Sequence, residues 1–214
     1  MPKVRAILFD NDGTLVDTHD LLLESFQYAT RTVLGTDFPE EVLMAGVGTP
    51  LVAQMAGFTD DPALQERLLV VYREYNHRIH DERVALFPGV QEGLAKLHDA
   101  GIKMGVVTAK LHALAWHGLE ITGAAPYLDC LIGPDDCPEA KPSPAPIAMG
   151  CELLGVTPAE CLYVGDSPYD MQAGNAAGCP TVAALWGMFD RDVLAAEHPA
   201  YEIERFGELL ALAL

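Results

Sequence analysis

Basic residues are scarce in this chain of 214 residues, which has 13 lysines and arginines against 31 acidic residues and a formal net charge of −18. An electrostatic field of this sign repels nucleic acid and anionic membrane surfaces, so we expect neither as a partner. The same field repels small phosphorylated molecules. A phosphate-binding site in this chain would therefore need a local positive charge, from lysine, a bound metal or oriented backbone amides.

Long apolar segments and paired cysteines are also missing. No apolar run approaches the roughly 20 residues that cross a bilayer. The first residues lack the apolar region and cleavage site of a secretory signal, so we expect a cytoplasmic protein. The five cysteines form no Cys-x-x-Cys pair, which argues against a disulfide framework and a structural zinc site. The composition, 50% hydrophobic and 21% charged, is that of a globular protein with a substantial core.

The chain does contain a series of short apolar runs, at residues 4–9, 102–107, 128–132, 161–164 and 180–184. Such runs are typical of parallel strands that are buried on both faces. Patterns with helical spacing lie between them, at residues 90–97, 145–154 and 168–177. This alternation predicts an α/β fold with a doubly wound, Rossmann-like parallel sheet.

One long segment interrupts the alternation. Residues 17–83 contain no convincing strand, and the stretches 21–34 and 62–80 read as amphipathic helices. We therefore predict an α/β core domain formed by residues 1–16 and 84–214, with residues 17–83 inserted as a separate helical domain.

Polar residues lie just past the ends of three of the apolar runs: Asp10, Thr108 and Asp166. In open α/β sheets, ligands bind beyond the carboxyl ends of the strands, so these side chains are expected to face one site. Lys141 lies in a loop before a predicted helix and offers a point charge for phosphate oxygens. Lys110 is equally consistent with solvent exposure and with a role at the substrate.

The first acidic segment, Asp10-Asn11-Asp12-Gly13, places two carboxylates two residues apart. A carboxylate can attack phosphorus directly, and a second acid can protonate the leaving oxygen and later activate water. Taken alone, the segment is more typical of an ordinary turn. Its position after a predicted buried strand is what favours chemistry.

A second acidic segment holds Asp166 and Asp170, four residues apart, where a strand is expected to lead into a helix. Together with Asp10, they offer the hard oxygen ligands that Mg²⁺ prefers. Asp166 and Ser167 are also good N-cap residues for that helix, and capping is compatible with metal binding. His77 and His80, three residues apart, make a poor metal site by themselves, and we expect them to be solvated.

Four segments together resemble the signature motifs of the haloacid dehalogenase superfamily, specifically its phosphatase branch. They are residues 9–17 (Phe-Asp-Asn-Asp-Gly-Thr-Leu-Val-Asp), 107–108 (Val-Thr), 141–144 (Lys-Pro-Ser-Pro) and 165–178, which begins Gly-Asp-Ser-Pro-Tyr-Asp. They occur in the family's order and span nearly the whole chain. Each is weak alone, and the combination is highly specific.

The resemblance implies roles for individual residues. Asp10 would be the nucleophile and a Mg²⁺ ligand, and Asp12 the general acid and base with its backbone carbonyl on the metal. Asp166 would bind Mg²⁺. Asp170 would either bind the ion directly or hold one of its ligands in place. Phosphate binding would fall to Thr108, Lys141, Asn11 and Ala109. The inserted helical domain would be a cap that contributes to substrate choice.

Comparison within the superfamily narrows the reaction. Its dehalogenases lack the second acid, which is present here as Asp12. Its phosphonate-cleaving members use a cap lysine, and no lysine lies between Lys3 and Lys96. A sugar phosphomutase shares Asp12 and remains an alternative. A non-catalytic binding protein with this fold is a further alternative, against which the retention of both Asp10 and Asp12 argues.

Within the phosphatases, the chain looks most like the phosphoglycolate phosphatase and pyrophosphatase group. Residues 46–51 (Gly-Val-Gly-Thr-Pro-Leu) resemble that group's substrate loop, which implies substrate contacts for Gly48, Thr49 and Lys110. Residues 108–110 (Thr-Ala-Lys) are similar to the group's Thr-Asn-Lys, with Ala109 in place of asparagine. The expected substrate is a small phosphate monoester, such as phosphoglycolate, or pyrophosphate. Five arginines are candidate cap cations: Arg31, Arg67, Arg73, Arg78 and Arg83.

Overall fold

The computed structural model describes residues 3–214. Residues 1 and 2, which belong to the predicted core segment 1–16, lie outside the described part. The central sheet has six parallel strands in the order β5-β4-β1-β6-β7-β8. Their bounds are β1 Ala6–Phe9, β4 Lys103–Val107, β5 Cys130–Ile132, β6 Cys161–Gly165, β7 Thr181–Ala184 and β8 Tyr201–Ile203. The predicted doubly wound α/β fold is confirmed.

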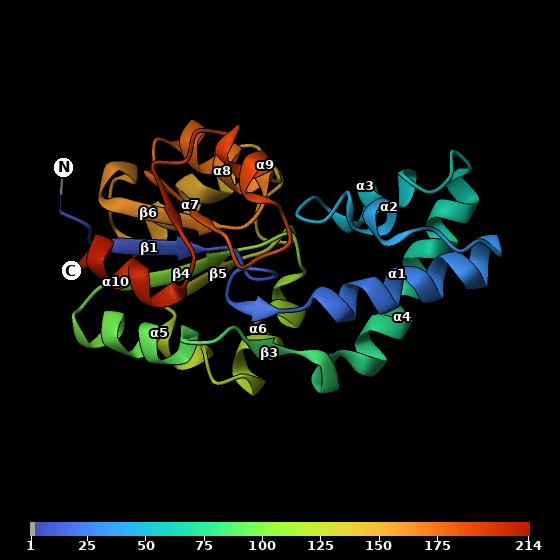
Figure 1. Cartoon of the computed structure of the whole chain (residues 1–214), viewed down its shortest axis with the longest axis horizontal. Coiled ribbons are helices and arrows are strands. Elements are labelled where there is room, and N and C mark those ends of the chain that lie inside the picture. The colour runs from blue at the N-terminus through green and yellow to red at the C-terminus, as the bar shows by residue number, and fades with distance from the viewer. Residues whose placement is uncertain (1–2) are drawn as a thin grey trace.

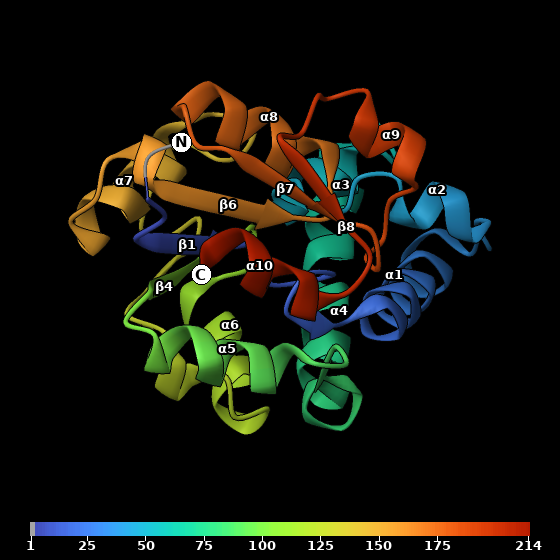
Figure 2. The ribbon, with the colours of Figure 1, turned by 60° about the vertical axis from the view of Figure 1, so that its left-hand side comes forward.

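Helices cover both faces of this sheet (Figure 1). Around it lie α5 Val90–Asp99, α6 His112–Ile121, α7 Ala145–Leu154, α8 Pro168–Ala177, α9 Arg191–Ala195 and α10 Leu209–Ala213. Helices α5, α6 and α10 contribute to one apolar cluster, and α7 and α8 contribute to another. Figure 2 shows the two layers of helices on either side of the strands.

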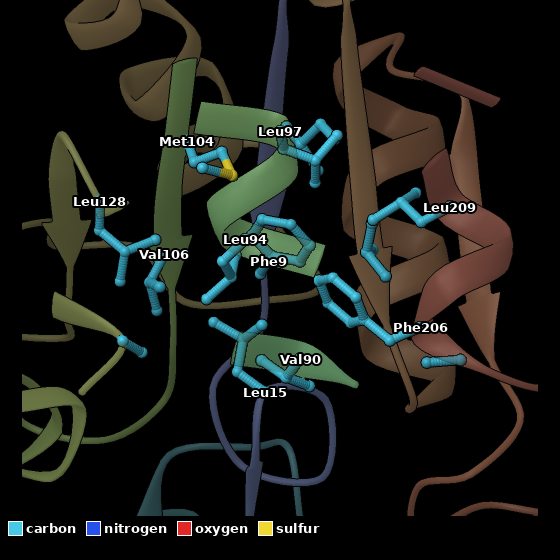
Figure 3. Packing of buried hydrophobic residues seen from close by; sticks show 14 of the residues in the cluster. Phe9, Leu15, Val90, Leu94, Leu97, Met104, Val106, Leu128, Phe206 and Leu209 are labelled. Atoms are coloured by element: carbon cyan, nitrogen blue, oxygen red, sulfur yellow. The ribbon is translucent and has the colours of Figure 1, made fainter. Parts of the chain in front are cut away.

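Strand β1 explains why the apolar runs are continuous rather than alternating. Its residues Ile7 and Phe9 belong to the cluster under α5 and α10, whereas Ala6 and Leu8 belong to the cluster under α7. Successive side chains of a strand point to opposite faces, so a strand covered on both faces needs apolar residues throughout. Figure 3 shows Phe9 among the side chains of the first cluster, beside Leu94 and Phe206.

The remaining helices precede β4 in the chain and extend to one side of the sheet (Figure 1). They are α1 His19–Leu34, α2 Glu40–Met44, α3 Leu51–Ala56 and α4 Pro62–Arg83. They share an apolar cluster of their own, which includes Phe26, Leu43 and Tyr72. A buried hydrogen bond from Asn76 Nδ2 to Ser25 Oγ, 3.1 Å long, joins α4 to α1.

Two short strands stand where this helical segment leaves and rejoins the rest of the chain. Strand β2, Val16–Asp17, pairs with the antiparallel β3, Ala85–Leu86. Helix α1 starts two residues after β2, and α4 ends two residues before β3. Among the described residues, no helix is long and apolar enough to cross a membrane.

Candidate active site

The sheet order brings the predicted site residues together. Asp10, Thr108 and Asp166 each follow a strand directly, and those strands, β1, β4 and β6, are neighbours with β1 in the middle. All three side chains are buried. Because parallel strands end at one edge of the sheet, the residues that follow them form the floor of one site.

Three of the predicted acids form a tight cluster. Carboxylate oxygens of Asp10, Asp166 and Asp170 lie within 4.8 Å of one another, and all three residues are buried. Burial raises the pKa of Asp10 well above its usual range, an effect that Lys141 offsets in part. Burial, reinforced by Asp170, raises the pKa of Asp166 to about 7. Hard oxygen ligands that repel one another in a dry site fit a divalent cation such as Mg²⁺.

Lys141 supplies the positive charge that the chain as a whole lacks. Its Nζ lies 3.0 Å from Asp10 Oδ1 and 2.7 Å from Asp170 Oδ1, and its side chain is only 2% exposed. Burial disfavours the ammonium form, but the two carboxylates outweigh burial and raise the pKa of Lys141. Lys141 is therefore held charged beside the predicted nucleophile.

Asp170 holds this lysine in place. Its Oδ1 also accepts a hydrogen bond from the Tyr163 hydroxyl at 2.9 Å. Its Oδ2 accepts from the backbone amide and the hydroxyl of Ser167, which caps the start of α8 in a reciprocal capping box. The predicted capping by Ser167 is present, and it fixes the rotamer of Asp170. With both oxygens engaged by donors, the carboxylate is suited to orienting Lys141 from behind the site.

Asp166 lies in a cradle of backbone and small residues. Its Oδ1 accepts a hydrogen bond from Thr14 Oγ1 at 2.8 Å, and its Oδ2 accepts one from the Met188 amide at 2.8 Å. A Cβ atom added at Gly13 or Gly187 would lie 2.2 Å from an atom of Asp166. Gly13 also has a φ of +86°, a backbone conformation that residues other than glycine rarely adopt.

The loop after β1 orients Asp10. The backbone amide of Asn11 donates to Asp10 Oδ1 at 2.7 Å. The Asn11 carbonyl accepts hydrogen bonds from the amides of Thr14, Leu15 and Val16, which closes the tight turn. Within the described residues, the buried Oδ1 of Asn11 has no hydrogen-bond partner. The side chain of Asn11 is thus near the site and leaves an acceptor unused.

Asp12 lies apart from the three-acid cluster and faces Lys110. Lys110 Nζ lies 2.7 Å from Asp12 Oδ1, and the two side chains are 10% and 15% exposed. Burial alone would raise the pKa of Asp12, but the charge and hydrogen bond of Lys110 outweigh it and lower that pKa. Of the two possibilities considered for Lys110, solvent exposure is wrong. The metal contact predicted for Asp12 through its backbone carbonyl stays a prediction.

A cavity of about 260 Å³ opens above Asp10, between the sheet edge and the helical segment. The predicted residues Asp12, Thr108, Ala109 and Lys110 line it from below, and Gly48 and Thr49 line it from above. Gly48 has a φ of +94°, and a Cβ atom there would lie 3.0 Å from Ser167 Oγ, so the loop between α2 and α3 touches the start of α8.

The upper wall of the cavity is largely apolar, with Leu22, Phe26, Val47 and Tyr72 among its residues. Of the five candidate arginines, Arg73 lines the cavity. Arg31 and Arg83 pair instead with Asp37 and Glu24, and Arg78 lies over the rings of Tyr28 and Tyr75.

Comparison with known proteins decides the family. The family model for haloacid dehalogenase-like hydrolases matches residues 7–184. The chain belongs to this family. It is 38% identical over 210 residues to a protein named "Putative pyrophosphatase PpaX" from Caldanaerobacter subterraneus, a match that covers 98% of this chain and 94% of that one. It is 34% identical to the pyrophosphatase PpaX of Bacillus velezensis, over 97% of this chain and 95% of that one.

Solved structures agree with this assignment. The crystal structure of a "predicted phosphoglycolate phosphatase" from Haemophilus somnus superposes on this haloacid dehalogenase-like hydrolase with a TM-score of 0.93. The two sequences are 26% identical, and the match covers all of both chains. The superfamily, its phosphatase-type enzyme class and the likeness to phosphoglycolate phosphatases and pyrophosphatases, all predicted from the sequence, are confirmed.

Sequence reasoning missed the part of the hydrolase that surrounds Asp166 from the β7 side. The Met188 amide and the small Gly187 are contributed by the loop that follows β7. Trp186 in the same loop donates from Nε1 to the Thr14 carbonyl at 3.1 Å. The available signal was a glycine three residues after the fifth apolar run, at the same end of the sheet at which the other strands carry their polar residues.

Proposed function

We propose that this hydrolase is a magnesium-dependent phosphatase that transfers the phosphoryl group of a small metabolite, or of pyrophosphate, to Asp10 and then to water. The observation that carries the proposal is the position of Asp10. Its carboxylate is buried beside the Lys141 ammonium and borders a cavity that also contains Asp12 and Thr108. The proposed nucleophile, a positive charge and a second acid thus lie at or beside one cavity.

Asp10 is oriented for attack by two donors on the same oxygen. The Asn11 amide and Lys141 both approach Oδ1, so neither engages Oδ2. In the first step a bond would form between an Asp10 oxygen and phosphorus while the bond to the leaving oxygen breaks. In the second step water would attack the same phosphorus and release Asp10 with inorganic phosphate.

Asp12, oriented by Lys110, would handle the protons. In its protonated form the Asp12 carboxyl would deliver a proton to the leaving oxygen, and the carboxylate so formed would then take one from the attacking water, which restores the acid. Thr108 and Lys141 would hold oxygens of the phosphoryl group, aided by backbone amides near Asn11 and Ala109. Preorganised donors of this kind stabilise the charge that develops in phosphoryl transfer.

A divalent metal, which phosphatases of this family generally use, fits the acidic cluster. Asp10 and Asp166 would hold Mg²⁺ together with the Asp12 carbonyl, and Asp170 would act from behind through Lys141. When bound, the ion supplies positive charge to the phosphoryl oxygens and relieves the repulsion between Asp10 and Asp166.

Residues 17–83 would act as the cap that selects the substrate. The cavity of about 260 Å³ suits a small molecule, and Arg73 and Lys110 add positive charge to its lining. Gly48 and Thr49 would contact the substrate from the loop between α2 and α3. Pyrophosphate and short phosphate monoesters such as phosphoglycolate match this size and charge, and the names of the relatives support them. The net charge of −18 disfavours nucleic acid as a substrate.

The test is phosphate release with Mg²⁺ from pyrophosphate, phosphoglycolate, sugar phosphates, nucleotides and p-nitrophenyl phosphate. Wild type is compared with Asp10→Asn and with Asp60→Asn, a control at an exposed acid outside the cavity. We expect release by wild type and Asp60→Asn and none by Asp10→Asn. Equal release by Asp10→Asn would overturn the assignment of the nucleophile, and NMR showing faster isomerisation than hydrolysis of a hexose phosphate would favour the phosphomutase.

A further inference from the structure

A second cluster of metal-ligating side chains lies where the helical segment meets the core. It consists of His80 and Asp81, in the last turn of α4, and His117, in α6. The two helices are separated in the chain by β3, α5 and β4. Figure 1 shows the end of α4 running down beside α6. None of these three residues lines the cavity above Asp10.

The three side chains converge on one carboxylate oxygen. Asp81 Oδ1 lies 2.9 Å from His80 Nδ1 and 2.9 Å from His117 Nε2. The three potential ligand atoms lie within 4.8 Å of one another. Ligands about 2.0–2.2 Å from a shared ion are about 3–3.5 Å apart, so small side-chain movements would place all three around one metal.

His80 is fixed in advance by its packing. The sequence suggested that His80 is solvated, and this was wrong, because it is only 2% exposed. Its ring packs on α6 at Gly118, where an added Cβ atom would lie 3.4 Å from ring atoms Cε1 and Nε2. The other two ligands are partly exposed, which gives an ion a route from solvent.

We propose that His80, Asp81 and His117 bind a transition-metal dication, with Zn²⁺ as the best fit, and that the bound ion ties the end of α4 to α6. Two imidazoles and one carboxylate suit Zn²⁺, whereas Mg²⁺ prefers oxygen ligands alone. Three protein ligands leave a position for water. The site is therefore distinct in chemistry from the all-oxygen cluster at Asp10, and it does not depend on the phosphatase activity.

Zn²⁺ binding is measured by calorimetry on the full chain, without an affinity tag, stripped of metal and held in excess Mg²⁺. The variants are His117→Ala and Asp81→Asn, whose side chains are 46% and 62% exposed, because a change at the buried His80 risks unfolding. The control is His98→Ala, at an exposed histidine of α5 whose Nδ1 is 4.0 Å from Asp99. Any Zn²⁺ held by the acidic cluster is retained in every variant.

We expect one Zn²⁺ that binds wild type and His98→Ala equally and binds His117→Ala and Asp81→Asn at least about 10-fold more weakly. Loss of even an outer partner of a ligand costs that much. Equal affinity in wild type and His117→Ala, or no such Zn²⁺ in wild type, would overturn the site. Amide hydrogen exchange tests whether the ion links α4 to α6. Zn²⁺ should slow exchange near residues 78–84 and 112–118 together. Protection of one segment alone would refute the link.

Discussion

Lys110 donates to Asp12 across 2.7 Å although 98 positions separate the two residues in the chain. Lys110 follows β4 and Asp12 follows β1, so the pair forms because these strands are neighbours. Both side chains line the cavity and are largely withdrawn from solvent. A charge-assisted hydrogen bond at such a position controls where the carboxyl of Asp12 points.

Removing this partner should slow catalysis without unfolding the protein. We expect Lys110→Met to lower kcat/KM about 10- to 100-fold, since a hydrogen bond to a charged group contributes about 1.5–3 kcal/mol. Steady-state kinetics on the best substrate provide the measurement. Lys96→Met, which alters a lysine of α5 away from the cavity, should leave kcat/KM unchanged. A Lys110→Met enzyme with the kcat/KM of wild type would show that Asp12 needs no partner.

The glycine after Trp186 should be essential to the geometry of Asp166. In Gly187→Ala the new Cβ would lie 2.2 Å from the Asp166 Cβ, so the carboxylate or the loop must move. We expect about 1–3 kcal/mol of lost stability and a higher Mg²⁺ requirement for activity. Gly207→Ala is the matched control, because nothing lies within 4 Å of its added Cβ. Urea unfolding and Mg²⁺ titration of activity measure the two effects.

The hydrogen bonds to Asp170 should differ sharply in their importance. Tyr163→Phe removes one neutral donor at 2.9 Å and should cost about 1 kcal/mol. Asp170→Asn removes the charge that faces Lys141 at 2.7 Å, and breaking a buried ion pair typically costs about 3–5 kcal/mol. Denaturant unfolding of both variants gives the comparison. Equal losses of unfolding free energy in the two variants would indicate that the negative charge of Asp170 adds nothing to stability.

Mg²⁺ should stabilise the fold. Asp10, Asp166 and Asp170 bring three buried carboxyl groups together, and Lys141 offsets their repulsion only in part. A ligand at 100 times its Kd adds about 2.7 kcal/mol. For a chain of this size, that corresponds to a rise in Tm of roughly 5–10 °C. Differential scanning fluorimetry of wild type, Asp166→Asn and Asp60→Asn measures it. We expect Asp166→Asn alone to lose most of the shift, and Ca²⁺ to bind but support little turnover.

An unchanged Tm in wild type would contradict the ligand set. If Mg²⁺ raises the Tm of Asp166→Asn as much as that of wild type, Asp166 is not a ligand of the metal.

The parts of the fold that the sequence predicts are those with continuous apolar runs. Five strands of the sheet correspond to such runs because both faces of each are covered. Strand β8 escaped prediction because its middle residue, Glu202, is charged and exposed, which breaks the apolar run. The short helices α2, α3, α9 and α10 have five or six residues each, too few to show a helical period.

The site could be predicted where a polar side chain follows a buried strand. Asp10, Thr108 and Asp166 carry that signal, and their convergence follows from the adjacency of β4, β1 and β6. Parts of the site that are formed by a backbone amide, or by the space that a glycine leaves, give little signal in a sequence. The Met188 amide and the space at Gly187 are examples. The pairing of Lys110 with Asp12 depends on rotamers, which residue types do not reveal.

The indole of Trp186 is hydrogen-bonded to the loop that holds the acidic cluster, which makes it a natural fluorescent probe of the candidate site. It is joined through the Thr14 carbonyl to the same residue whose hydroxyl holds Asp166, so two hydrogen bonds separate the ring from the acidic cluster. The other tryptophan, Trp116, precedes His117 in α6. One indole therefore lies beside the candidate active site and the other beside the junction of α4 and α6. Replacing either tryptophan with phenylalanine would leave the fluorescence of the other to report on its own place without a label.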